Sequence, residues 1–97
     1  MVRHIVMWKL KEMSEEEKTV AKNTAKTMLE ALVGKIEGLQ SLEVGFNYKS
    51  GSYDLCLVGV YDDKDALEYY QNHPEHLKCK EYIHTIIAER GFCDYEF

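Results

Sequence analysis

Apolar and polar side chains alternate along the segment from Val2 to Lys11, near the start of the chain. Alternation with a period of two predicts a β-strand whose successive side chains point to opposite faces of a sheet. One set of alternate positions is apolar except for a single histidine, and consists of Val2, His4, Val6, Trp8 and Leu10. The other set is mixed, and consists of Arg3, Ile5, Met7 and Lys9. Because both sets contain apolar residues, we expect a sheet that is covered on both faces.

A capping box at Ser14–Glu17 predicts the start of a first helix. The Ser14 hydroxyl can accept a hydrogen bond from the backbone N–H of Glu17, whose carboxylate can accept one from the backbone N–H of Ser14. We expect the helix to continue to about Val33, because Gly34 can take the left-handed conformation that often follows a helix. Its predicted apolar face consists of residues at helical spacing, namely Ala21, Ala25, Met28, Leu29 and Leu32.

A second helical segment is predicted after Asp62–Asp63, where an aspartate side chain can cap the first turn. Pro74 must interrupt this segment, because the residue before a proline is disfavoured in the helical conformation. The same proline suits the first turn of a new helix. The residues expected to face inward are Ala66, Leu67 and Tyr70 before the break, and Leu77, Ile83 and Ile86 or Ile87 after it.

Three further segments have the pattern of strands, namely Gln40–Lys49, Tyr53–Tyr61 and Phe92–Phe97. A hairpin around Gly51 is expected to join the first two, and Gly91 is expected to separate the last strand from the helix before it. The resulting order is β-α-β-β-α-β, which predicts an α+β, ferredoxin-like sandwich with an antiparallel sheet. With 97 residues, the chain is expected to form one domain, residues 1–97.

In this topology the helices cover only one face of the sheet. Apolar residues expected on the other face include Ile5, Met7, Val58 and Val60. Leaving such side chains in water forfeits about 1.5–3 kcal/mol for each large one. A second copy of the chain, packed sheet to sheet, would recover this free energy. We therefore expect a homodimer that forms through the helix-free sheet face and closes a dimeric α–β barrel.

The charge and composition narrow the range of partners. The formal net charge is −5, whereas nucleic acids and anionic membranes are bound by basic surfaces. No segment approaches the roughly 20 apolar residues that a membrane-spanning helix needs, and the chain opens directly in patterned structure, so we expect a cytoplasmic protein. Cys56, Cys79 and Cys93 are odd in number and form no C-x-x-C motif. We expect them to be small apolar residues rather than disulfide partners or zinc ligands.

The candidate chemistry is concentrated in the segment Tyr69–His76, together with His4. Histidine titrates near neutral pH and can transfer protons, and a tyrosine hydroxyl can orient it or stabilise an oxyanion. Tyr70 is expected to face inward, because it has helical spacing from the apolar residues before it. The same histidines also have structural explanations. His76 can brace the helix that opens at Pro74, and His4 can be a core histidine bonded to a backbone carbonyl.

The other histidines of the chain raise the question of a metal site. His73, Glu75 and His76 are close in sequence, but a zinc site needs three or four convergent ligands and nothing in the sequence directs these side chains to one point. We therefore expect no metal. His84 is expected only to be exposed on the last helix.

Several short motifs resemble those of the stress-responsive A/B barrel domain (Dabb) family. They lie in order along nearly the whole chain and are His4, Ile36–Leu39, Val44–Gly45, Tyr53–Leu55, Tyr70–His76 and Asp94–Glu96. The resemblance implies the ferredoxin-like fold and the barrel-forming homodimer. One enzyme of the family closes a linear polyketide by an aldol step without a metal or organic cofactor.

The catalytic residues of that enzyme imply roles for three side chains of the present chain. His76 would be the general base, Tyr70 its hydrogen-bond partner, and His4 a donor to the substrate carbonyl or enolate. A further tyrosine of that enzyme has no counterpart in Ala25–Glu30, so its reaction serves as a model for the mechanism and not as the predicted reaction.

The expected function is therefore that of a homodimer whose interior pocket binds a small, largely apolar carbonyl molecule, with His/Tyr proton transfer and no cofactor. Two alternatives remain open at this point. One is a non-enzymatic assembly whose dimers stack into rings, and the other is a cofactor-independent monooxygenase.

Overall fold

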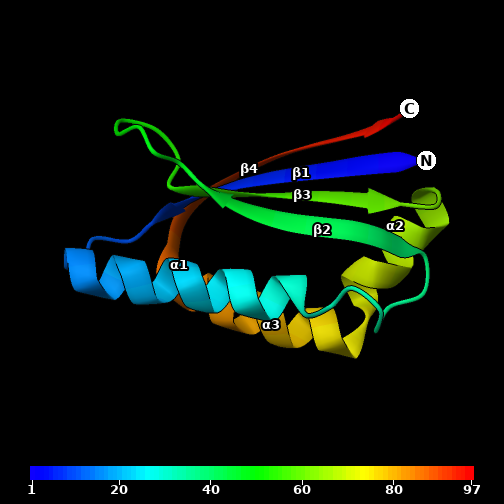
Figure 1. The fold of residues 1–97 in the computed structure, drawn as a ribbon, viewed down its shortest axis with the longest axis horizontal. Helices are drawn as coiled ribbons and strands as arrows, with labels where there is room; N and C mark the ends of the chain where they lie inside the picture. The colour runs from blue at the N-terminus through cyan, green and yellow to red at the C-terminus, as the bar shows by residue number, and fades with distance from the viewer.

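Four strands form a single antiparallel sheet in the order β2-β3-β1-β4, with three helices packed beside it (Figure 1). The computed structural model describes residues 1–97. In chain order the elements are β1 (Val2–Leu10), α1 (Glu15–Glu30), β2 (Leu39–Phe46), β3 (Leu55–Tyr61), α2 (Lys64–Asn72), α3 (Pro74–Ile86) and β4 (Ile87–Glu96). The predicted ferredoxin-like order is confirmed, and the second helical region is divided at Pro74 as expected.

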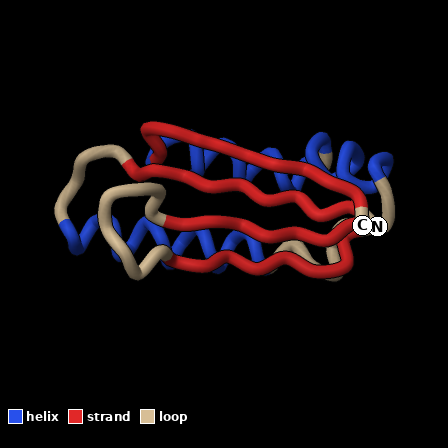
Figure 2. The backbone as a smooth tube through the Cα atoms, turned by 90° about the horizontal axis from the view of Figure 1, so that it is seen from above, coloured by secondary structure: helices blue, strands red, loops and turns tan.

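All three helices lie on the same side of the sheet, and the opposite face has no cover (Figures 1 and 2). The two termini lie at the same end of the sheet, where the amino group of Met1 donates a hydrogen bond to the carbonyl of Phe97 at 3.2 Å. Because the helices all lie on one side, the chain forms two layers, one of helices and one of sheet.

No helix is both long enough and apolar enough to cross a membrane.

The alternation predicted for β1 is confirmed. Its even-numbered side chains are buried under the helices, and His4, with 4% of its surface exposed, is the one buried polar residue among them. The predicted capping box is also present, since both hydrogen bonds between Ser14 and Glu17 form at 3.1 Å. Asp63 caps α2 by accepting a hydrogen bond from the backbone N–H of Ala66.

The last strand begins at Ile87, so its predicted start at Phe92 is wrong. β4 pairs with β1 along nearly its whole length, from Val2 opposite Glu96 to Leu10 opposite Ile87. Gly91 consequently lies inside the strand rather than before it. A Cβ at this position would lie 3.0 Å from the hydroxyl oxygen of Tyr53, so the glycine leaves room for a packed ring and does not mark a turn.

Three other predicted boundaries also shift. The first helix ends at Glu30 rather than Val33, and a turn follows it. β2 ends at Phe46 and β3 starts at Leu55, so the connection between them is a longer loop than the predicted hairpin. A hydrogen bond from the backbone N–H of Leu10 to the carboxylate of Asp54 ties this loop to the end of β1.

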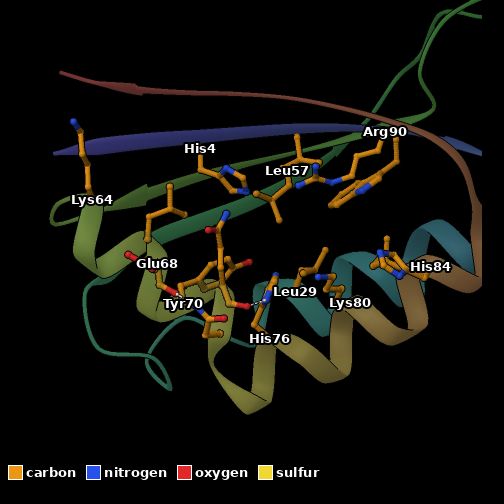
Figure 3. Close-up of a pocket in the computed structure, with 16 residues that line it drawn as sticks. His4, Leu29, Leu57, Lys64, Glu68, Tyr70, His76, Lys80, His84 and Arg90 are labelled. Atoms are coloured by element: carbon orange, nitrogen blue, oxygen red, sulfur yellow. Dashed lines mark hydrogen bonds between the residues drawn. The ribbon is translucent and has the colours of Figure 1, made fainter.

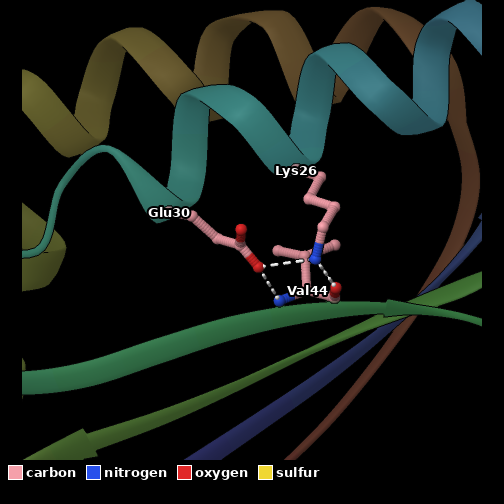
Figure 4. Close-up of polar contacts among 3 residues, drawn as sticks. All are labelled: Lys26, Glu30 and Val44. Atoms are coloured by element: carbon pink, nitrogen blue, oxygen red, sulfur yellow. Dashed lines mark hydrogen bonds and ion pairs between the residues drawn. The ribbon is translucent and has the colours of Figure 1, made fainter.

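A polar link joins α1 to the edge strand β2 (Figure 4). The Glu30 carboxylate accepts hydrogen bonds from the Lys26 ammonium at 2.7 Å and from the backbone N–H of Val44 at 2.9 Å. Lys26 also donates to the Val44 carbonyl at 2.7 Å. The bond from Lys26, followed by that from Val44, lowers the pKa of Glu30 below its usual range.

Replacing Glu30 by glutamine is expected to lower the free energy of unfolding at neutral pH by about 0.5–1 kcal/mol, because both partners of the ion pair are partly exposed. A lowered folded-state pKa means that this stabilisation is present above the unfolded value of about 4.3 and is lost as the pH falls through the folded pKa. Urea unfolding measured across the acid range tests this.

Glu12→Gln is the control, because Glu12 forms no ion pair. A difference between Glu30→Gln and the wild-type protein that stays constant down to pH 2–3, well below the ordinary pKa of glutamate, would contradict the assignment.

Candidate functional site

A cavity of about 700 Å³ lies between the inner face of the sheet and helices α2 and α3 (Figure 3). This volume falls within the range of roughly 300–1,000 Å³ that is typical of small-molecule sites. His4, Tyr70 and His76, the three residues predicted to form the site, all line it. Seven of its sixteen lining residues are hydrophobic, so the cavity is more polar than the sequence led us to expect.

His4 lies on the sheet side of the cavity and is held by Asp94. The two residues are directly opposite each other in the pairing of β1 with β4. The Nδ1 atom of His4 is hydrogen-bonded to a carboxylate oxygen of Asp94, which can only accept while it is ionised. Nδ1 therefore carries the hydrogen and Nε2 is left free of this contact. The structural explanation of His4 predicted a hydrogen bond to a backbone carbonyl. The structure shows a bond to the Asp94 carboxylate instead.

His76 lies on the helix side of the cavity, in the first turn of α3 (Figure 3). Its Nδ1 donates a hydrogen bond to the backbone carbonyl of Gln71 at 3.2 Å. Because a carbonyl only accepts, neutral His76 has its hydrogen on Nδ1 and a lone pair on Nε2. Burial lowers the pKa of His76, and the positive charges of Lys80, His4 and Arg90 lower it further, against an opposing effect of the Gln71 carbonyl.

Tyr70 contacts His76 through its ring and not through the predicted hydrogen bond. The ring centroids are 4.3 Å apart, while the Tyr70 hydroxyl has no hydrogen-bond partner. The last carbonyls of a helix lack partners within the helix, so the Gln71 carbonyl near the end of α2 is available to the His76 N–H. Burial raises the pKa of Tyr70 above its ordinary value, so the phenol stays protonated and keeps a hydrogen that it can donate.

Tyr61 belongs to the same cluster, although nothing in the sequence singled it out. Its ring packs 5.0 Å from that of Tyr70 and 6.1 Å from that of His4, measured between centroids. The ring lies across Gly59, where a Cβ would come within 2.7 Å of the Tyr61 hydroxyl. Gly59 is also the residue opposite His4 in the pairing of β1 with β3. The glycine therefore makes room for the phenol behind the cavity wall.

Tyr69 and His73, two of the candidate side chains in the Tyr69–His76 segment, lie outside the cavity. Tyr69 is 54% exposed, which confirms that Tyr70 is the inward-facing member of the pair. His73 caps α3, because its Nδ1 accepts a hydrogen bond from the backbone N–H of Glu75 at 3.1 Å. No three His, Cys, Asp or Glu side chains of the chain converge to form a metal-binding group.

Four basic residues that the sequence did not assign to the site also line the cavity, namely Lys64, Lys80, His84 and Arg90. Lys80 and His84 follow His76 along α3 at intervals of four residues, and Arg90 reaches the cavity from β4. The spacing on α3 is visible in the sequence, because residues four apart share one face of a helix. Arg90 lines the cavity only because β4 pairs with β1, and no residue near it in the sequence indicates this position. His84 is exposed, as predicted, and also lines the cavity.

The fold and cavity define a ferredoxin-like α+β protein with an interior pocket on the helix side of its sheet. The chain belongs to the stress responsive A/B barrel domain (Dabb) family, whose pattern matches residues 2–97. Among curated proteins, it is similar to the uncharacterized protein SCO4036 of Streptomyces coelicolor, with 33% identity over 104 residues and full coverage of both chains.

Solved structures of similar chains have the same fold. A dimeric protein of unknown function and ferredoxin-like fold from Bacteroides fragilis is 36% identical, has a TM-score of 0.93, and aligns over 99% of this chain and 95% of that one. A Dabb family protein with a ferredoxin-like fold from Mesorhizobium loti is 21% identical, has a TM-score of 0.76, and aligns over 99% of this chain and 95% of that one. The second likeness concerns the fold alone.

Histidine titration by NMR is expected to give a pKa for His76 below the ordinary value of about 6.5. Lys80→Met should raise it, because removing a nearby positive charge makes protonation less costly. Since the folded pKa is the lower one, the contribution of His76 to stability is complete above the unfolded pKa and is lost as the pH falls below it. A His76 pKa at or above that of the unfolded chain would contradict the description of this site.

Proposed function

We propose that this chain forms a homodimer in which each cavity binds a small carbonyl compound and transfers a proton at the carbon beside its carbonyl group. The observation that carries this proposal is the arrangement of His4 and His76 on opposite walls of one cavity (Figure 3). In each ring Nδ1 is engaged, by Asp94 or by the Gln71 carbonyl, which leaves Nε2 available to a ligand.

His76 is suited to act as the general base. Its lowered pKa keeps the imidazole neutral at pH 7, and its tautomer leaves a lone pair on Nε2. In the proposed step Nε2 accepts a proton from the carbon next to the carbonyl, and the electron pair of the broken C–H bond moves to form an enolate. The enolate carbon then attacks a second carbonyl, and the proton held by His76 passes to the new alkoxide. No proton is gained or lost overall.

His4 and Tyr70 are suited to stabilise the enolate. Asp94 orients the His4 imidazole through Nδ1. In the proposed step His4 carries a second hydrogen on Nε2, the Asp94 carboxylate compensates the resulting positive charge, and this N–H donates a hydrogen bond to an enolate oxygen. Tyr70 lines the cavity, and its buried hydroxyl, like that of the adjacent Tyr61, has no hydrogen-bond partner within bonding distance. A small movement of Tyr70 toward a ligand oxygen would give its hydroxyl a partner. A buried polar group without a partner costs free energy, which favours such a contact.

His76→Gln is expected to slow hydrogen–deuterium exchange at the carbon beside the carbonyl by about 10²–10⁴-fold, the usual contribution of a general base. The measurement is ¹H NMR in D₂O with a panel of aryl ketones and β-diketones. Asp94→Asn should slow exchange by a smaller factor, since it leaves His4 in place without its counter-charge.

His73→Asn is the control for the loss of a histidine, because asparagine is a good helix cap and residue 73 lies outside the cavity. Exchange in His76→Gln at the wild-type rate would remove the proposed role of His76.

The dimer interface is proposed to be the helix-free face of the sheet. Ile5, Val58 and Val60 lie there, half-buried by their neighbours, and Met7 is 37% exposed. The Bacteroides fragilis protein to which this chain is similar is described as dimeric, which supports self-association. A second sheet packed on this face would remove the remaining apolar surface of these side chains from water.

Val58→Asp is expected to convert the dimer into a monomer at micromolar concentration, because an unpaired carboxylate would be buried at the centre of the interface. Native mass spectrometry or light scattering measures the change. Val20→Asp introduces the same charge on α1, where residue 20 is 64% exposed, and should leave the dimer intact. Dimers of equal stability in both variants would place the interface elsewhere.

Of the two alternatives, a non-enzymatic assembly with a filled interior is less consistent with a cavity of this size. No residue of the cavity specifically favours a cofactor-independent monooxygenase. The proton-transfer proposal accounts for both the histidines and the space between them.

A further inference from the structure

One end of the cavity carries a concentration of positive charge. Lys80 and His84 face the cavity from α3, and Arg90 faces it from β4 on the opposite wall (Figure 3). We refer to these three residues as the cationic end. Lys64 and Glu68 lie at the other end of the cavity, on α2 (Figure 3).

This charge is unusual for the protein that contains it. The chain has a net charge of −5, yet its cavity lining includes two lysines and an arginine against a single carboxylate, that of Glu68. Lys64 is paired with Glu96, whereas neither Lys80 nor Arg90 forms an ion pair. Lys80, His84 and Arg90 are exposed, so water screens part of their mutual repulsion, and a bound anion relieves the part that remains.

The surroundings of the cationic end indicate what kind of anion fits. Trp8, Val6 and Ile83 also line the cavity, and they provide an apolar surface beside the charges. The Arg90 guanidinium lies over the ring of Phe92, with 4.9 Å from its central carbon to the ring centroid. A planar guanidinium held by an aromatic ring is well suited to bind a carboxylate with two hydrogen bonds. An inorganic anion would leave the apolar surface without a contact.

We propose that the cationic end binds the carboxylate of an oxo acid, and that the apolar part and the carbonyl of this acid extend along the cavity toward His76. A helix rises 1.5 Å per residue, so Lys80 and His84 lie about 6 Å and 12 Å along α3 from His76. This separation fits acids whose carboxylate and carbonyl are several bonds apart better than 2-oxo acids. The assignment of the reacting end rests on the function proposed above, whereas the binding of the carboxylate is measurable without it.

Binding of the carboxylate also affects the proposed base. The charged or titratable groups that line the cavity with His76 are His4 on β1, Lys64, Glu68 and Tyr70 on α2, Lys80 and His84 on α3, and Arg90 on β4. Lys80 and Arg90 are among the groups that lower the pKa of His76. An anion that neutralises them should raise this pKa and make His76 a stronger base when the substrate is bound.

The experiment compares a stable aryl oxo acid, 4-oxo-4-phenylbutanoate, with its uncharged methyl ester. Affinities are measured by calorimetry and by NMR shifts of the cavity histidines, in the full-length protein. We expect the acid to bind about tenfold more tightly than the ester to the wild-type protein, a difference of about 1.4 kcal/mol. This preference should weaken with added salt and disappear in Lys80→Met/Arg90→Met.

Lys78→Met is the matched control. Lys78 is on the same helix, its side chain is 71% exposed, and it is not part of the cavity lining, so the preference for the acid should persist in this variant. Circular dichroism of each variant verifies that the fold is retained. His76→Gln should also keep the preference, which separates this proposal from the one about proton transfer.

Any one of the following results would overturn the proposal. They are equal affinity of the wild-type protein for acid and ester, no binding of the acid at millimolar concentration, and the same preference for the acid in Lys80→Met/Arg90→Met as in the wild-type protein. Competition by inorganic phosphate at an affinity equal to that of the acid would also overturn it, because the organic part of the ligand would then contribute nothing.

Discussion

β1 is hydrogen-bonded on both sides, to β3 and to β4, and the rest of the structure depends on this pairing. Because side chains alternate along a strand, a central strand directs one set of residues toward the helices and the other toward the bare face of the sheet. His4 belongs to the first set and reaches the cavity, while Ile5 and Met7 belong to the second and form part of the proposed dimer interface. A shift of β1 by one residue would exchange these two sets.

The break between α2 and α3 shapes the other wall of the cavity. Pro74 begins α3, and the cap at His73 allows the chain to change direction between two helices that would otherwise be one. This change of direction brings the Gln71 carbonyl to the imidazole of His76 and the Tyr70 ring against it. The same short segment therefore ends one helix, starts the next and sets the tautomer of a candidate base.

Electrostatics distinguish the cavity from the rest of the molecule. The protein is acidic, but basic side chains from α2, α3 and β4 converge around a space that contains little negative charge. Burial and, to a smaller extent, the charges of Lys80, His4 and Arg90 lower the pKa of His76, which suits a proton acceptor. In the proposed site Lys80 and Arg90 also bind the acidic group of a ligand. If both proposals hold, binding and proton transfer are coupled through the same charges.

Local patterns in the sequence determined much of this protein. The capping box at Ser14, the alternation along β1 and the break at Pro74 each depend on residues within a few positions of one another, and all three appear in the structure as predicted. His4, Tyr70 and His76 were also identified as candidate site residues, from their chemistry and from a family resemblance, and they do line one cavity.

Tertiary structure alone decided which groups these residues contact. The pairing of His4 with Asp94 joins positions 90 residues apart, and it exists only because β4 pairs with β1 in a particular register. The same pairing extends β4 back to Ile87 and brings Arg90 to the cavity, neither of which has a signal in the neighbouring sequence. The Tyr70 hydroxyl was predicted to bond His76, but the partner of His76 is the Gln71 carbonyl, which is free to accept because it lies at the end of α2. Propensity and spacing act over a few residues, whereas these contacts are set by the packing of strands and helices distant in the chain.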